Sequence, residues 1–159
     1  MEILAVLFVA LIIWLTIGKG FMEGLRGSGP TSLRPEDVFR WPPEGEYDFD
    51  IVGESNYQPA LKALAGDHGE ESADKECTAL IVPEDNNPHD GSAVRVDIDG
   101  STVGYLSRED ARRFRRRLGA KKMGKNPTCC AAMVVGGFRL KNGLLASYGV
   151  KLDIKLFDT

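Results

Sequence analysis

Histidine and cysteine are scarce in this chain, which has two of the former and three of the latter among its 159 residues. Neither His68 nor His89 stands in a pattern that pairs a nucleophile with a base, and the sequence has no Gly-x-Ser-x-Gly motif and no glycine-rich phosphate-binding loop. The cysteines lack Cys-x2-Cys spacing, which argues against a zinc site. We therefore expect no catalytic activity, no cofactor and no metal.

An odd number of cysteines, two of them adjacent (Cys129 and Cys130), cannot be fully paired in disulfides. A secreted fold held by disulfides is therefore a poor interpretation, and reduced thiols in a cytosol-like compartment fit better. Internal repeats and heptads are also lacking. With 43% hydrophobic and 27% charged residues, the chain has enough apolar side chains for a folded core.

One long hydrophobic run begins the chain: residues 3–17 (ILAVLFVALIIWLTI) carry no charge. Residues 3–22 as a helix span roughly 30 Å, which matches the hydrocarbon core of a bilayer. A cleaved signal peptide and a buried core helix are the alternatives, but a signal peptide needs a basic residue before the run, where this chain has Glu2. We predict a single transmembrane helix over 1–22, and the basic residues that follow the apolar run, Lys19, Arg26 and Arg34, place the rest of the chain in the cytoplasm.

The next segment, residues 23–45, is rich in Gly, Pro and Ser and has no sustained periodicity, which is typical of a linker. Val38, Phe39 and Trp41 could still dock on the domain that follows. That domain is predicted over residues 46–159.

Period-two alternation predicts six strands in this domain. Asp99-Gly100 is a strong hairpin signal between two of them. The predicted strands cover residues 47–51, 78–82, 94–98, 102–106, 130–135 and 150–156.

Two helices interrupt the strands. The first covers residues 58–65 and is followed by the stop signal Gly66. The second begins after the N-cap Ser107 and ends at Gly119, with Ala111, Phe114 and Leu118 on its buried face. This pattern predicts a mainly β fold, an OB-like six-stranded antiparallel β-barrel with two short α-helices.

The segment from Pro83 to Ser92 (PEDNNPHDGS) joins two of the strands and concentrates acids and amides around Pro88. One interpretation is a plain turn, because Asn, Asp, Pro and Gly are turn formers. The other is a rigid loop that presents polar groups to a ligand. A Ca²⁺ loop is disfavoured because the required acidic spacing is missing.

Charge is distributed unevenly. Residues 108–125 contain nine Lys or Arg and two acids, a charge of +7, so that with a net charge of −3 the rest of the chain carries −10. Such a dense basic helix is suited to the phosphates of a nucleic acid. Anionic lipid headgroups are an equally physical target, and a solvated helix face is the third interpretation.

Two stretches, GESNYQPALKALAG (53–66) and LIVPEDNNPHDGSAVRVDIDGSTVGYL (80–106), resemble the HIRAN domain. This module stands alone in bacteria and phages and forms the N-terminus of fork-remodelling helicases. The most specific matches are the Asn-Pro-x-Asp turn at 87–90, the Ala-Val-x-Val strand after it and the Val-Gly-Tyr-Leu strand. The resemblance spans about residues 47–156 and implies an OB-like barrel that binds single-stranded DNA, in the helicases at a free 3′ end.

The resemblance also implies roles for individual residues. Asn87 and Asp90 match polar residues of the family's pocket, and Asp90 occupies the position that holds the 3′-hydroxyl. Tyr148 matches an aromatic residue of a late strand. Arg108 matches a basic residue that follows the Gly-x-Leu strand.

The chain departs from the helicase pattern at several positions. The two tyrosines that grip the terminal bases in the helicases correspond to Asn56 and His89 here, and the preceding arginine corresponds to Ser55. Tyr105 stands where the helicases have histidine. Base stacking is worth roughly 1–3 kcal/mol per base, so the loss of these platforms weakens end recognition unless Tyr57, Tyr105 or His89 substitutes for them. In the leading hypothesis His89 and Tyr148 stack on bases.

The leading hypothesis is a membrane-anchored module that binds nucleic acid, most specifically single-stranded DNA or its 3′ end. The alternative is a protein-interaction module whose basic helix contacts anionic lipid. An enzyme using Asp85, His89 and Asp90 with a metal ranks last. The predicted nucleic-acid-binding residues are Asn56, Tyr57, Asn87, His89, Asp90, Tyr105, Arg108, Arg112, Arg115, Arg116 and Tyr148.

Overall fold

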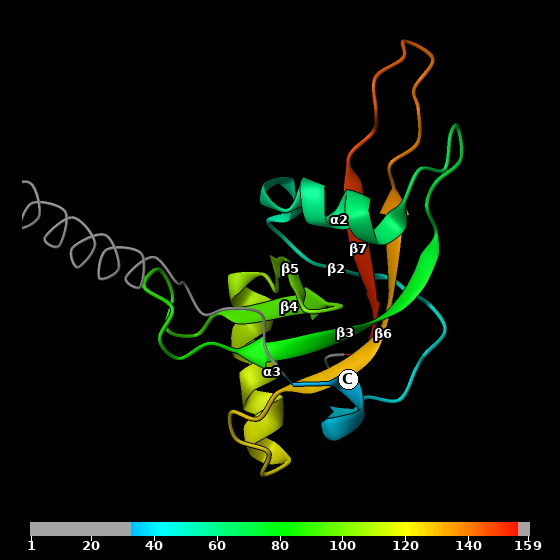
Figure 1. Cartoon of the computed structure of the whole chain (residues 1–159). Coiled ribbons are helices and arrows are strands. Elements are labelled where there is room, and N and C mark those ends of the chain that lie inside the picture. Colours follow the sequence, from blue (N-terminus) through cyan, green and yellow to red (C-terminus); the bar gives the residue numbers. More distant parts are fainter. Residues whose placement is uncertain (1–32, 156–159) are drawn as a thin grey trace, which may run out of the picture.

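The computed structural model describes residues 33–155 (Figure 1). Its strands are β1 (Phe39–Arg40), β2 (Phe49–Asp50), β3 (Lys75–Pro83), β4 (Val94–Ile98), β5 (Ser101–Tyr105), β6 (Thr128–Gly136) and β7 (Tyr148–Asp153). Its helices are the α-helices α2 (Gln58–Ala65) and α3 (Arg108–Ala120) and the 3-10 helices η1 (Pro35–Asp37) and η2 (Glu54–Asn56). The predicted membrane segment at 1–22 lies outside the described residues.

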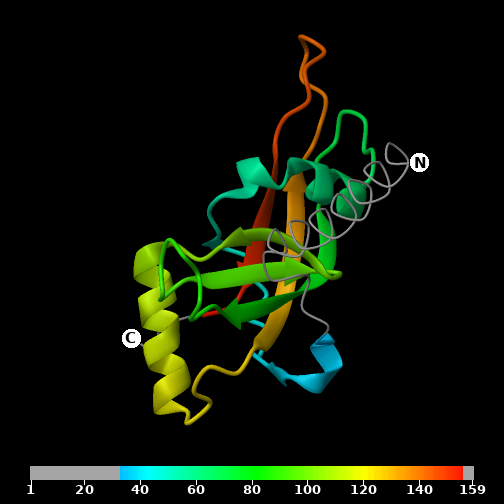
Figure 2. The same ribbon diagram turned by 60° about the vertical axis from the view of Figure 1, so that its left-hand side comes forward.

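Six strands form one antiparallel sheet in the order β2-β7-β6-β3-β4-β5, which curls into a half-barrel (Figures 1 and 2). An isolated antiparallel bridge between Val52 and Tyr105 joins the two ends of this sheet, with reciprocal N–H···O distances of 2.8 and 2.9 Å. The predicted mainly β fold, with six antiparallel strands and two α-helices, is confirmed. Strand β1, which pairs in parallel with the start of β6, was not predicted.

The core fills the concave face of the half-barrel. Successive side chains of a strand point to opposite faces, so every second residue of β3 and β4 is turned inward. These inward residues are at most 1% exposed: Ala79, Ile81, Val94, Val96 and Ile98. Phe114 and Leu118 of α3 belong to the same cluster and are fully buried.

Helix α3 has the N-cap and the buried face that the sequence predicts. The Oγ of Ser107 accepts a hydrogen bond from the N–H of Asp110 at 3.2 Å, which satisfies one of the unpaired amides of the first turn. The buried residues Ala111, Phe114 and Leu118 recur at helical spacing on the side toward the core. The opposite side of α3 carries charged residues. In Figure 2 this helix runs along the half-barrel.

The last part of the segment predicted as a linker packs on the domain. Trp41 is 1% exposed, and its ring centroid lies 6.0 Å from that of Phe114. Its indole N–H donates to the Oγ1 of Thr128 at 2.9 Å, and its backbone N–H donates to the carbonyl of Cys129 at 2.8 Å. Trp41 is therefore a core residue that the domain needs.

Between β6 and β7 the chain forms a long hairpin, residues 137–147, which we call the arm. It projects beyond α2 and the end of the sheet (Figures 1 and 2). At its base Gly137 has φ of 73°, and a Cβ placed there would lie 1.9 Å from the ring of Tyr148. Only glycine fits this close approach.

Within residues 33–155, no helix combines the length and hydropathy required to cross a bilayer.

Candidate nucleic-acid interface

The loop between β3 and β4, residues 84–93, is shaped by its own side chains. Oδ1 of Asn87 accepts hydrogen bonds from the N–H groups of His89 (2.9 Å) and Asp90 (3.2 Å). Oδ1 of Asp90 in turn accepts one from the N–H of Ser92 (2.8 Å). Such Asx turns fix the local backbone of the loop. The imidazole of His89 is left exposed at the tip.

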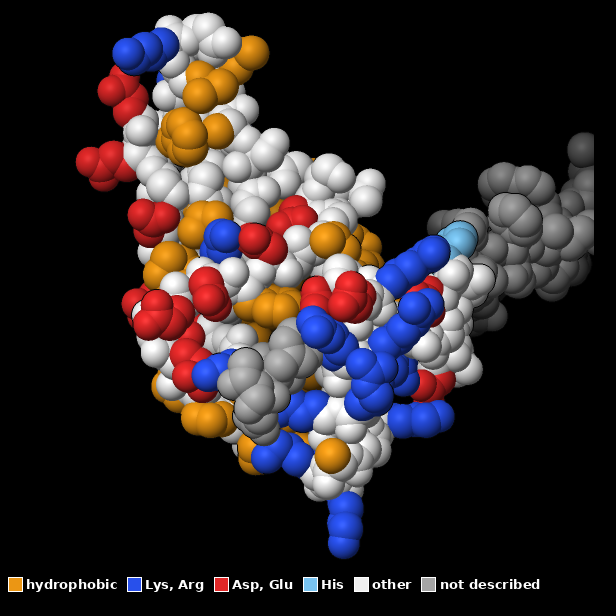
Figure 3. All heavy atoms as spheres, turned by 180° about the vertical axis from the view of Figure 1, so that it is seen from behind, with side chains coloured by type: hydrophobic (Ala, Val, Ile, Leu, Met, Phe, Trp, Pro, Cys, Tyr) orange, Lys and Arg blue, Asp and Glu red, His pale blue; other side chains and the backbone are white. Residues whose placement is uncertain are grey.

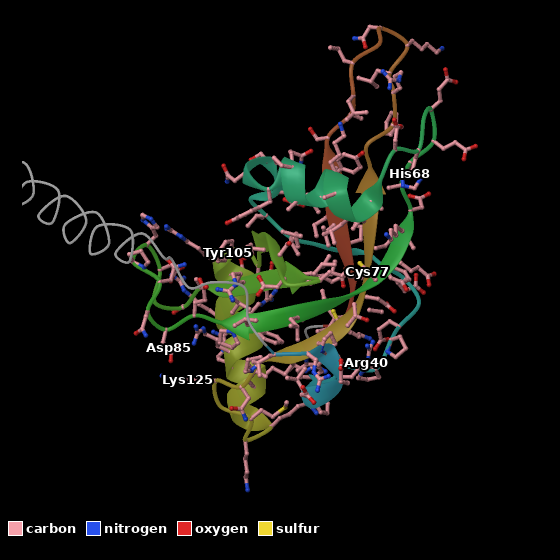
Figure 4. All side chains as sticks on the ribbon, in the orientation of Figure 1. Arg40, His68, Cys77, Asp85, Tyr105 and Lys125 are labelled. Carbon is pink, nitrogen blue, oxygen red and sulfur yellow. The ribbon has the colours of Figure 1, made fainter. Side chains whose placement is uncertain are left out.

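Cations from α3 and the segment after it neutralise the acids of this loop. Nη1 of Arg115 lies 2.7 Å from Oδ1 of Asp85, and Nζ of Lys125 lies 2.5 Å from Oδ2 (Figure 4). Hydrogen bonds from Lys125 and Arg115 hold the pKa of the Asp85 carboxyl below its usual range. Nε of Arg108 lies 3.7 Å from Oδ2 of Asp90. Asp85 is therefore closely paired with two cations, whereas the ion pair of Asp90 is longer and its Arg108 partner is exposed.

Behind the loop lies a buried ion network. The guanidinium of Arg95 binds both carboxylate oxygens of Asp97, with Nε–Oδ1 at 2.8 Å and Nη2–Oδ2 at 3.0 Å, and its Nη1 contacts Glu84. Thr102 donates to Asp97 at 2.9 Å, and Asn87 donates to Glu84 at 2.9 Å. The side chains of Arg95 and Asp97 are 6% and 0% exposed. This network connects the outward face of β4 to the loop.

Two tyrosines adjoin the network. Tyr105 is the cross-strand neighbour of Arg95, so both side chains lie on the same face of the sheet. The ring of Tyr57 lies 6.5 Å from that of Tyr105, tilted by 41°, and both rings are half-buried. Burial and the charge of Glu84 raise the pKa of Tyr105 above its usual range (Figure 4). Asn56, next to this pair, is exposed.

A stripe of arginines continues the surface along α3. Arg108, Arg112 and Arg116 are spaced by four residues, which places them on one side of the helix at intervals of about 6 Å. All three are exposed. Within residues 33–155, Arg112 and Arg116 form no ion pair. Figure 3 shows Lys and Arg side chains gathered over this face.

Two other arginines of α3 are held by the domain. Besides Asp85, Arg115 donates to the carbonyls of Ser92 (2.9 Å) and Ala93 (2.8 Å), so it positions the loop and has little left for a phosphate. The guanidinium of Arg117 lies 4.4 Å from the ring centroid of Trp41. The arginines of α3 therefore differ in role: Arg115 holds the loop and Arg117 packs on Trp41, whereas the arginines of the stripe are exposed.

Tyr148 is not part of this surface. It is 4% exposed, and its hydroxyl donates to the carbonyl of Gly66 at 2.9 Å, beneath the end of α2. Its ring also contacts the backbone at Gly137, which leaves no face for a base to stack on. Tyr148 therefore stabilises the base of the arm, and its ring is not open to a ligand.

Several of the other predicted residues are neighbours. Tyr57 lies beside Tyr105, Asp90 lies beside Arg108, and Glu84 and Arg95 connect Asn87 to Tyr105. Sequence reasoning missed Glu84, Arg95 and Asp97. Arg95 and Asp97 stand at the polar positions of β4, and alternation alone does not indicate that they are buried.

Among residues 33–155, no group of three His, Cys, Asp or Glu side chains is arranged to hold a metal ion. No protein-family model, no curated protein and no solved structure matches this chain.

Proposed function

We propose that this chain is a membrane-anchored, non-catalytic module that binds single-stranded nucleic acid, most specifically single-stranded DNA at a 3′ end. The observation that supports it best is the continuity of the surface. Aromatic rings, a polar turn and unpaired arginines adjoin one another, and the loop acids between them are paired with cations. The resemblance to the HIRAN domain leads to the same ligand.

The phosphates are assigned to the arginine stripe. Arg112 and Arg116 are exposed, and within the described chain they form no ion pair, so a phosphate does not have to displace an acid to reach them. Each contact releases condensed counterions from the nucleic acid, which favours binding at low salt. Arg108 adds a third contact where the stripe meets the loop.

The bases are assigned to Tyr57 and Tyr105. The two rings are tilted by 41° rather than stacked on each other, and both are partly open to solvent. A base that stacks on either ring gains roughly 1–3 kcal/mol whatever its identity. The pair thereby takes the place of the helicase tyrosines, which correspond to Asn56 and His89 in this chain.

The 3′ end of the nucleic acid is assigned to the turn at 87–90. Oδ1 of Asp90 is occupied by the N–H of Ser92, whereas Oδ2 contacts only the exposed Arg108, at 3.7 Å, among the described residues. A 3′-hydroxyl can donate to this second oxygen. A 3′-phosphate brings negative charge to the same carboxylate and is repelled.

The test is fluorescence anisotropy with the full chain in a neutral detergent and oligonucleotides that carry either a free or a phosphorylated 3′ end. We expect the free end to bind about tenfold more tightly, the value of one charge-assisted hydrogen bond. Asp90→Asn should abolish this preference. Asp99→Asn is the matched control, because Asp99 is an exposed acid of the β4–β5 turn and has a positive φ that asparagine tolerates.

Two results contradict the proposal: no binding of either oligonucleotide, or an end preference that survives in Asp90→Asn. A chain that ignores oligonucleotides but binds anionic vesicles through Arg112 and Arg116 would instead support the lipid-contacting alternative. The membrane anchor at 3–22 and the cytoplasmic position of the domain are part of the same proposal. They rest on the hydrophobic run and the basic residues after it.

A further inference from the structure

The tip of the arm is a surface that nucleic-acid binding does not use. Six large hydrophobic side chains are exposed in the described part of the chain, and three of them lie within six residues of the arm. They are Leu140 (40% exposed), Leu144 (63%) and Leu145 (45%). Exposed apolar side chains gathered at one projecting point indicate a docking site, whereas scattered ones need no explanation.

The arm presents these leucines in a fixed geometry. Within its turn the N–H of Leu140 donates to the carbonyl of Leu144 at 2.7 Å, and the N–H of Gly143 donates to the carbonyl of Leu140 at 2.8 Å. At its base the N–H of Arg139 donates to the carbonyl of Gly69 at 2.7 Å. Because the hairpin is already formed, little ordering entropy is lost when its tip binds.

Charge and shape narrow the choice of partner. Arg139 and Lys141 flank Leu140 and are exposed, and no acid occurs between residues 136 and 152. Leucines next to cations match the boundary between acyl chains and phosphate headgroups. The tip also projects beyond the rest of the described chain (Figure 1), so it can reach the interface of a fluid bilayer without a matching groove.

We propose that the tip of the arm, residues 139–145, inserts into the interfacial layer of a lipid bilayer that contains anionic lipid. The contact is shallow. The neighbouring loop, residues 66–74, lies closer to the body of the protein in Figure 1 and carries acids that anionic headgroups repel. These acids are Asp67, Glu70, Glu71 and Asp74.

The test uses the full chain in phosphatidylcholine vesicles that contain a minority of phosphatidylserine. An environment-sensitive fluorophore is attached to Leu144→Cys or, as the control, to Asn126→Cys, which is exposed in the segment after α3. Cys129 and Cys130 are buried and burial raises the pKa of Cys77 to about 11, so at neutral pH the introduced cysteine reacts first. Labelled wild-type chain gives the background.

Nitroxide lipids with the quencher just below the headgroups should quench the label at 144 roughly threefold more than the label at 126. Adding Leu140→Ser and Leu145→Ser, both at exposed positions, should remove most of this difference without unfolding the protein. Replacing phosphatidylserine by phosphatidylcholine should weaken the quenching, and so should Arg139→Gln with Lys141→Gln.

Equal quenching at positions 144 and 126 overturns the proposal, as does a chain that does not float with the vesicles. A label at 144 that is shielded from water but beyond the reach of the lipid quenchers also overturns it. If the particle then has twice the mass of one chain by light scattering, the tip binds a second copy of this chain.

Discussion

Removing two arginines from α3 should change how nucleic-acid binding responds to salt. For single strands the logarithm of the affinity falls with the logarithm of the salt concentration with a slope of about −0.7 per neutralised phosphate. Three contacts from Arg108, Arg112 and Arg116 therefore predict a slope of about −2, and a fourfold rise in salt should weaken binding about 20-fold. In Arg112→Gln/Arg116→Gln one contact remains. The slope should drop to about −0.7, with only about threefold weakening over the same range.

The assay is a salt titration of the affinity by fluorescence anisotropy, with the full chain in neutral detergent. Lys62→Gln/Lys141→Gln is the matched control, because it removes the same charge from exposed residues of α2 and the arm. Its slope should equal that of the wild type. If the two double variants share one slope, binding responds to net charge alone, and the assignment of phosphates to the stripe is wrong.

Three further predictions concern the domain itself. Arg95→Met leaves the buried carboxylate of Asp97 without its partner and should lower the free energy of unfolding by about 3–5 kcal/mol in urea titrations; a loss below about 1 kcal/mol would contradict the buried network. Trp41→Ala opens a cavity beside Phe114 and should lower the free energy of unfolding by about 3–5 kcal/mol, measured by thermal unfolding. If Trp41 were a linker residue, the same substitution would leave that free energy almost unchanged. Burial raises the pKa of Cys77 to about 11, so its rate of alkylation should still rise about tenfold per pH unit between pH 9 and pH 10; a rate that levels off at pH 9 would refute the raised pKa.

The parts of the fold that follow from local rules could be predicted from the sequence. Alternation and short apolar runs located all six strands of the sheet to within three residues of their bounds, and α2 has the predicted bounds. The N-cap at Ser107 was also correct. In each case the signal lies in neighbouring residues, because pleat, helical period and capping are properties of a short stretch of chain.

What could not be predicted depends on pairing between distant residues. The two-residue strand β1 has no alternation of its own, and it exists because it pairs with β6 almost 90 residues later. Arg95 and Asp97 stand at the polar positions of their strand, and nothing local indicates that they are buried. Tyr148 is different. It has the same parity as the buried Val150 and Leu152, so its inward position was readable from the alternation.

The bridge between Val52 and Tyr105 links the spacing of the two proposed base-binding rings to the closure of the sheet. The first strand of the sheet and the last are held together by the two backbone hydrogen bonds of this pair, and beside them the buried side chain of Ile51 packs against Gly104. Tyr57 follows one side of the bridge along the chain, and Tyr105 forms the other side. The distance between the two rings that we assign to the bases is therefore tied to the closure of the sheet, and we expect it to change little while the core is intact.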